Sequence, residues 1–131
     1  MNKIRLPVVL ILLFIGCVST ATKAAEGTQV KHIVLCWLKE SGNPAHRHKI
    51  IETSRSFRKI PRVLKVSAGE VIPSDREIVD DSFDVAIMLT FANTDDMNAY
   101  LEHPLHKDAV QKVLLPLVRK IVVYDYTEVV F

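Results

Sequence analysis

Cysteine is scarce in this sequence, where Cys17 and Cys36 are the only two among 131 residues. Cys17 falls in a predicted export leader, which leaves Cys36 without a partner in the mature chain. An internal disulfide is therefore excluded. Because the neighbours of Cys36 are apolar, we expect its thiol to be buried and inert rather than reactive.

Glycine is also scarce, with four residues, and the sequence contains neither a glycine-rich phosphate loop nor a nucleophile elbow. The five histidines have no carboxylate or cysteine at a recognised metal-ligand spacing. Asp80, Asp81 and Asp84 lack the spacing and the turn glycine of a calcium loop, and we interpret them as part of a solvated loop. We therefore expect no metal and no cofactor.

An excess of positive charge is missing once a leader is removed. Of the 17 lysine and arginine residues, Lys3, Arg5 and Lys23 precede residue 25, whereas all 15 aspartate and glutamate residues follow it. The mature domain is then close to neutral, with its charges interspersed along the chain. Proteins that bind nucleic acid usually present a basic face, so we expect no nucleic-acid partner.

A hydrophobic run long enough to span a bilayer is absent as well. The uncharged apolar stretch of residues 6–18 follows the basic residues Lys3 and Arg5, which is the layout of a secretory signal. We predict that residues 1–24 are an export signal.

Two routes of processing stay open for this signal. Residues 14–17 (Phe-Ile-Gly-Cys) resemble a bacterial lipobox, in which Cys17 would carry the lipid and tether the protein to a membrane. Cleavage after Ala21 or Ala24 is the alternative. Either route exports residues 25–131 as one domain, to the bacterial periplasm, to a membrane-anchored position or to the outside.

The remaining sequence alternates between strand and helix patterns. Strands are predicted at residues 30–38, 63–72, 83–91 and 120–131, and helices at 44–59, 94–103 and 104–116. The order β-α-β-β-α-β, with the second helix broken at Pro104, predicts an α+β ferredoxin-like fold with a four-stranded antiparallel sheet and helices on one face. Because the strands are apolar on both faces, we expect a second copy to cover the other face in a homodimer whose sheets enclose a barrel.

The segment from Tyr100 to His106 (Tyr-Leu-Glu-His-Pro-Leu-His) is the best candidate site, because it places a phenol and two imidazoles in seven residues. His32 lies on the face of the first strand that the helices should cover. If His32, Tyr100 and His106 converge, they could transfer a proton next to a carbonyl, with His106 as base, Tyr100 as donor and His32 orienting. The alternative is that the three groups only satisfy one another as buried polar residues.

We predict three further contacts to a ligand, from Val34, Met88 and His103. His103 has an alternative role, because a cationic imidazole before Pro104 would cap the end of the second helix favourably.

Several segments together resemble the stress-responsive dimeric α+β barrel (Dabb) family. They are Lys31–Leu35, Pro61, Val66–Gly69, Phe83–Ala86, Ala99–His106, Pro116–Val118 and Val123–Tyr126. The resemblance implies a homodimeric α+β barrel, in a family where most members have no assigned reaction. It also implies that His32, Tyr100 and His106 stand where a plant polyketide cyclase of this fold has its working residues.

Three functions are compatible with the sequence. The first is an exported homodimer that binds a small apolar or phenolic ligand between sheet and helices, without established catalysis. The second is a cyclase-like, isomerase-like or small monooxygenase-like enzyme that uses His106, Tyr100 and His32. The third is a structural stress protein in which that space is filled.

Overall fold

The computed structural model describes residues 28–131. The predicted signal at residues 1–24 and the predicted lipid site at Cys17 lie outside the described residues. Within residues 28–131, none of the helices combines the length and the apolar character that a membrane crossing requires.

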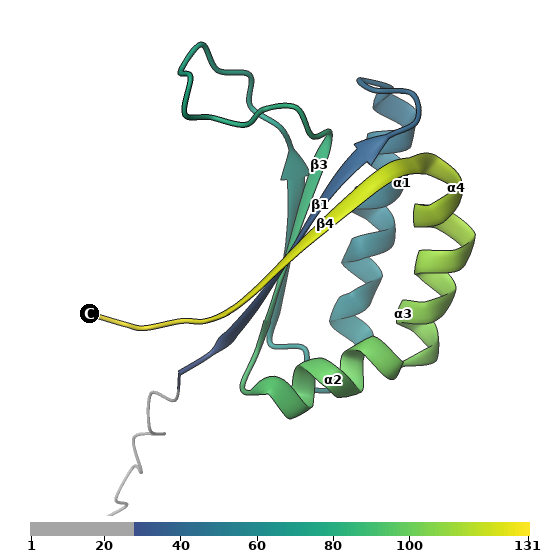
Figure 1. Ribbon diagram of the computed structural model, residues 1–131. Coiled ribbons are helices and arrows are strands. Elements are labelled where there is room, and N and C mark those ends of the chain that lie inside the picture. The colour runs from purple at the N-terminus through teal and green to yellow at the C-terminus, as the bar shows by residue number, and fades with distance from the viewer. Residues whose placement is uncertain (1–27) are drawn as a thin grey trace, which may run out of the picture.

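The elements follow the predicted order. They are β1 (Val30–Leu38), α1 (Pro44–Arg55), the 3₁₀ turn η1 (Ser56–Lys59), β2 (Lys65–Glu70), β3 (Val85–Phe91), α2 (Thr94–Glu102), α3 (Pro104–Ala109), the π-helical turn η2 (Val110–Leu114), α4 (Leu115–Leu117) and β4 (Val118–Thr127). The sheet order is β2-β3-β1-β4, and every neighbouring pair is antiparallel. Helices α1, α3 and α4 lie on one side of this sheet (Figure 1). The predicted ferredoxin-like α+β fold is therefore confirmed.

Three strands are shorter than predicted, and one of them is β3, which begins at Val85 instead of residue 83. β2 ends at Glu70 because its ladder with β3 ends there, where Glu70 pairs with Val85. β4 ends at Thr127 because its partner strand β1 begins opposite it, at Val30. Beyond these ladders single backbone hydrogen bonds continue, from the Val71 N–H to the Asp84 oxygen at 3.3 Å and from the Glu128 N–H to the Gln29 oxygen at 2.7 Å.

Both predicted helix starts form as capped turns. Asn43 accepts hydrogen bonds from the backbone N–H groups of Ala45 and His46, and Pro44 occupies the first turn of α1. Asn93 accepts from the N–H of Asp96 at the start of α2. These caps set the direction in which each helix crosses the sheet.

The core lies between the sheet and the helices. Its strand residues alternate along β1 and β3, and they are buried: Val30, Val34, Cys36, Leu38, Val85, Ile87, Leu89 and Phe91. Cys36 is fully enclosed, and burial raises the pKa of its thiol to about 11. The predicted burial of this thiol is confirmed.

The prediction that Asp84 belongs to a solvated loop is wrong. Its side chain is only 1% exposed and accepts hydrogen bonds from the N–H of Leu38 at 2.9 Å and of Gly42 at 2.6 Å, and it pairs with Arg47 at 3.1 Å. Burial opposes the charge, but these bonds and Arg47 together hold the pKa of this carboxyl below its usual range. Asp84 therefore ties the end of β1 to the turn before α1.

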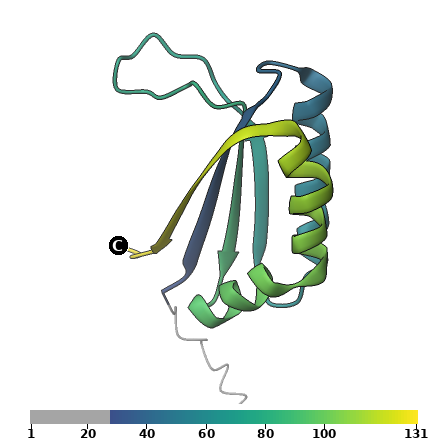
Figure 2. The ribbon, with the colours of Figure 1, turned by 45° about the vertical axis from the view of Figure 1, so that its right-hand side comes forward.

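The opposite face of the sheet has no helix over it, as Figure 2 shows from the side. The apolar residues on this uncovered face, identified from the strand registers, include Ile33, Leu35, Ala86, Met88, Val122, Tyr124 and Tyr126, and the polar residues Lys31, Ser67 and Thr90 share it. Tyr124 is 56% exposed and Tyr126 is 48% exposed. The loop between β2 and β3 projects beyond the sheet on this side (Figure 1).

Replacing Asp84 tests its structural role. We expect Asp84→Ala to lower the free energy of unfolding by about 3 kcal/mol, because it leaves the buried N–H of Leu38 without an acceptor and removes one of the two carboxylates that pair with Arg47. The measurement is urea unfolding followed by circular dichroism. Asp75→Ala, at an exposed position of the β2–β3 loop, is the control and should change little. Equal effects of the two substitutions would contradict the role given to Asp84.

Candidate functional site

The structure brings His32, Tyr100 and His106 together beneath the helices. His32 comes from the helix-facing side of β1, Tyr100 from the last turn of α2 and His106 from the first turn of α3. The ring centroids of Tyr100 and His106 are 4.5 Å apart, and those of His32 and Tyr100 are 6.0 Å apart. The phenol therefore lies between the two imidazoles, and His32 and Tyr100 are almost fully buried.

The break between α2 and α3 sets this arrangement. α2 ends at Glu102, the backbone of His103 is extended, and Pro104 starts α3 in a new direction. Proline favours the first turn of a helix because its missing N–H is not needed there. Tyr100 and His106 therefore approach the same part of the sheet from two different helices.

His103 acts at this break rather than in the group around Tyr100. Its Nδ1 accepts the N–H of Leu105 at 3.1 Å, so it caps the start of α3. An accepting nitrogen carries no proton. The expectation of a cationic cap at the end of the preceding helix is therefore replaced by an acceptor cap at the start of the next.

A cavity of about 210 Å³ adjoins the three candidate residues. Val34 lines it, together with eight other apolar residues: Phe57, Ile87, Leu89, Leu101, Val110, Leu114, Ile121 and Val123. Val123 stands opposite Val34 in the register and so faces the helices, yet it is 45% exposed. The cavity therefore opens to solvent at the edge strand β4.

Met88 does not line this cavity. It stands opposite Ile33 on the uncovered face of the sheet, whereas its neighbours Ile87 and Leu89 point toward the helices. Of the three predicted ligand contacts, the structure places only Val34 beside His32, Tyr100 and His106.

Asp125 is a member of the site that the sequence did not indicate. It stands opposite His32 in the β1–β4 register, and its Oδ1 lies 2.6 Å from His32 Nδ1. The side chain of His32 is 6% exposed and that of Asp125 is 43% exposed. The pair thus connects the buried imidazole to the open edge of the cavity. Alternation along the last strand groups Asp125 with Ile121 and Val123, but only the register shows which residue it meets.

Burial changes the acidity of the other two groups. It raises the pKa of the Tyr100 phenol above its usual range, so the hydroxyl keeps its proton at neutral pH. Burial also lowers the pKa of His106, and the nearby His32 lowers this pKa further. The hydrogen bond from His106 Nδ1 to the Leu101 carbonyl, at 3.0 Å, has the opposite effect on the pKa. The site therefore combines a protonated phenol with a neutral imidazole beside an apolar space.

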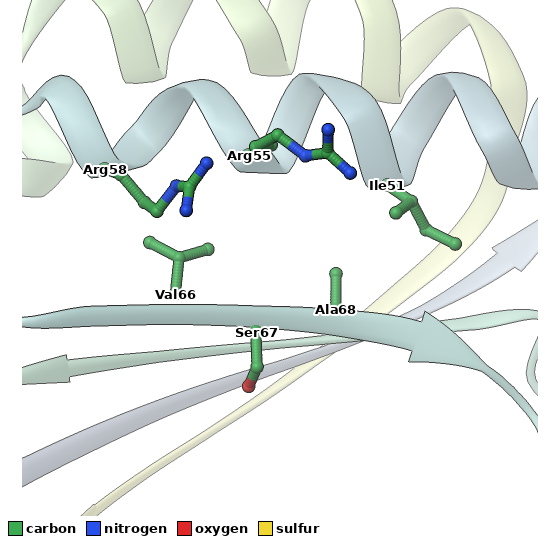
Figure 3. Close-up of a pocket in the computed structure, with 6 residues that line it drawn as sticks. All are labelled: Ile51, Arg55, Arg58, Val66, Ser67 and Ala68. Carbon is green, nitrogen blue, oxygen red and sulfur yellow. The ribbon is translucent and has the colours of Figure 1, made fainter.

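A second hollow of about 250 Å³ lies at the other edge of the sheet, between α1 and β2. Figure 3 shows Arg55 and Arg58 reaching over Val66 and Ala68, with Ser67 pointing to the other face of the strand. Arginine stays protonated in proteins, so this hollow has no group for proton transfer. In residues 28–131 no cluster of three or more metal-ligating side chains occurs. The cavity beside Tyr100 is therefore the candidate site.

Comparison with known protein families identifies the domain. Residues 30–128 match the Dabb family, described as the Stress responsive A/B Barrel Domain. The chain belongs to this family. A comparison with curated protein sequences finds no match.

Solved structures similar to this Dabb protein share its fold. One is a dimeric ferredoxin-like protein of unknown function from Thermobifida fusca, with 20% identity, a TM-score of 0.63 and coverage of 79% of this chain and 93% of that one. A Dabb family protein from Mesorhizobium loti has 18% identity, a TM-score of 0.64 and coverage of 78% and 98%. A hydroxynitrile lyase from Passiflora edulis has 24% identity, a TM-score of 0.67 and coverage of 77% and 94%.

The lowered pKa of His106 makes stability depend on pH. Unfolding restores the ordinary pKa of about 6.5, so below that pH the unfolded chain binds more protons than the folded one. We expect the free energy of unfolding to fall as the pH drops from about 6.5 through the lowered pKa, and His106→Gln to remove this part of the dependence. An NMR titration of the histidine rings gives the pKa directly, and a value at or above the ordinary one would contradict the burial argument.

Proposed function

We propose that this Dabb protein is an exported homodimer that binds a small, mostly apolar or phenolic molecule in the cavity between sheet and helices. The cavity carries this proposal, because an apolar lining with a few convergent polar groups is typical of small-molecule sites. The signal-like residues 1–24 support export, which the mass of the mature N-terminus would test.

The open cavity also argues against a purely structural role. Protein interiors are close-packed, and an unfilled apolar space reduces stability because its lining loses van der Waals contacts. If the barrel contributed stability alone, a larger side chain at Val34 or Val110 would fill the space and raise the free energy of unfolding. The space is instead kept open next to His32, Tyr100 and His106.

The uncovered face of the sheet supports a homodimer. Contiguous apolar surface of this kind marks an interaction site in soluble proteins, and a two-fold axis would let each copy cover the other. The similar proteins from Thermobifida fusca and Bacteroides fragilis are both described as dimeric.

Light scattering tests the homodimer. We expect a dimer at micromolar concentration for the chain from Glu26 onward, and a monomer for Tyr124→Asp, because a carboxylate on the uncovered face would lose its hydration once a second copy packs there. Leu115→Asp is the control: Leu115 is 52% exposed but lies in α4, on the helix side of the sheet. A wild-type monomer at this concentration would refute the homodimer.

Protein-observed NMR tests the cavity. We expect small cyclic apolar compounds to bind the wild type and to shift the ring resonances of Tyr100 and His106. Val123→Trp should weaken this binding at least tenfold, because the larger side chain blocks the opening at β4. Val129→Trp adds the same side chain at an exposed position outside the cavity and should leave binding unchanged. Equal binding by the two variants would place the ligand elsewhere.

Proton-transfer catalysis is the second candidate function. It is favoured by the neutral imidazole of His106 beside a protonated phenol, the combination that a general base and a hydrogen-bond donor require. One similar structure is named a hydroxynitrile lyase. Deuterium exchange next to the carbonyl of an added ketone would reveal such chemistry, and it should be lost in Tyr100→Phe and His106→Gln. Exchange no faster than in buffer leaves binding as the function.

A further inference from the structure

The hydrogen bonds of the two site imidazoles indicate which ring nitrogen carries the proton. A carbonyl oxygen can only accept, so His106 Nδ1, at 3.0 Å from the Leu101 oxygen, must be the N–H donor. An ionised carboxylate also only accepts, so His32 Nδ1, at 2.6 Å from Asp125 Oδ1, must donate as well. In a neutral imidazole one nitrogen donates and the other accepts. In the neutral form of each ring, Nε2 is therefore the hydrogen-bond acceptor.

These acceptors have no partner within the part of the protein that the structure describes. Within residues 28–131, neither Nε2 atom takes part in a side-chain hydrogen bond, and the Tyr100 hydroxyl makes none either. The fully enclosed polar atoms without a partner in the same region are His46 Nδ1 and Arg47 Nε, which belong to α1. The polar atoms of the site are therefore not sealed off, and the cavity that their residues line is the space available to them.

A ligand in this cavity would meet two acceptors and one hydroxyl. The Tyr100 hydroxyl can donate to one Nε2 or to the ligand, but it supplies a single proton. A ketone has no hydrogen-bond donor. When it displaces water from the cavity, at least one Nε2 is therefore left without a group that donates to it. A hydroxyl group can donate to an Nε2 and accept from Tyr100. An unpaired buried acceptor is costly, so the difference favours the hydroxyl.

We propose that Asp125 is a positioning residue that holds His32 in the Nδ1–H form, and that the cavity thereby selects an apolar molecule carrying a hydroxyl donor over the corresponding ketone. This inference rests on the proposed binding function. The place of Asp125 at the edge of the sheet suits the role, because its carboxylate remains partly in water while the imidazole is buried.

The protonated nitrogen of each ring can be read without any ligand. In a ¹⁵N-labelled sample at about pH 8.5, where imidazoles are neutral, nitrogen chemical shifts should show Nδ1–H for both His32 and His106. Asp125→Asn should move His32 to the Nε2–H form, because the amide N–H can donate to Nδ1, and should leave His106 unchanged. Asp75→Asn is the matched control and should alter neither ring. A wild-type His32 in the Nε2–H form would overturn the role of Asp125.

Cyclohexanol and cyclohexanone form a matched pair for the selectivity. We expect the wild type to bind the alcohol about tenfold more tightly, the difference that one hydrogen bond makes, and Asp125→Asn to lose most of this preference. Equal or tighter binding of the ketone would overturn the selectivity while leaving the binding function in place. Failure of both compounds to bind would overturn the selectivity and the binding function together.

Discussion

Pro104 has no backbone N–H, and the second helix of the fold therefore cannot run through it without losing a hydrogen bond. The chain responds by ending α2 at Glu102 and starting α3 with an acceptor cap from His103. Two separate helices therefore approach the sheet in place of a single continuous one. Tyr100 and His106 meet at this break, and the cavity lies where the two helices and the sheet meet.

The sheet contributes the other part of the site through β1, one of its two inner strands. β1 pairs with β3 on one side and with β4 on the other, so its helix-facing residues form the floor of the core. His32 is the polar residue in this row, and Asp125 on the edge strand meets it. Because no further strand lies beyond β4, the cavity can open to solvent at this edge of the sheet. The same sheet leaves its other face uncovered, which separates the surface that we propose for the homodimer from the cavity that we propose for ligand binding.

Much of the fold could be predicted from local patterns in the sequence. Strand alternation, the two asparagine caps and the proline break gave the element order and the face on which His32 lies, because these signals depend only on neighbouring residues. The limits of β2 and β4 were less predictable, because a strand ends where its partner ends. Asp84 was misjudged for a similar reason, since its donors come from β1 and from the following turn.

The sequence by itself therefore determined the ferredoxin-like order of elements, the apolar character of both sheet faces and the meeting of a tyrosine and a histidine at a helix break. Only the tertiary structure decided that Asp125 meets His32, that Met88 lies on the other face and that a cavity remains beside Tyr100. Alternation with a period of two assigns a residue to a face of the sheet. The register between β1 and β4, which are separated by most of the chain, depends on how the whole core packs.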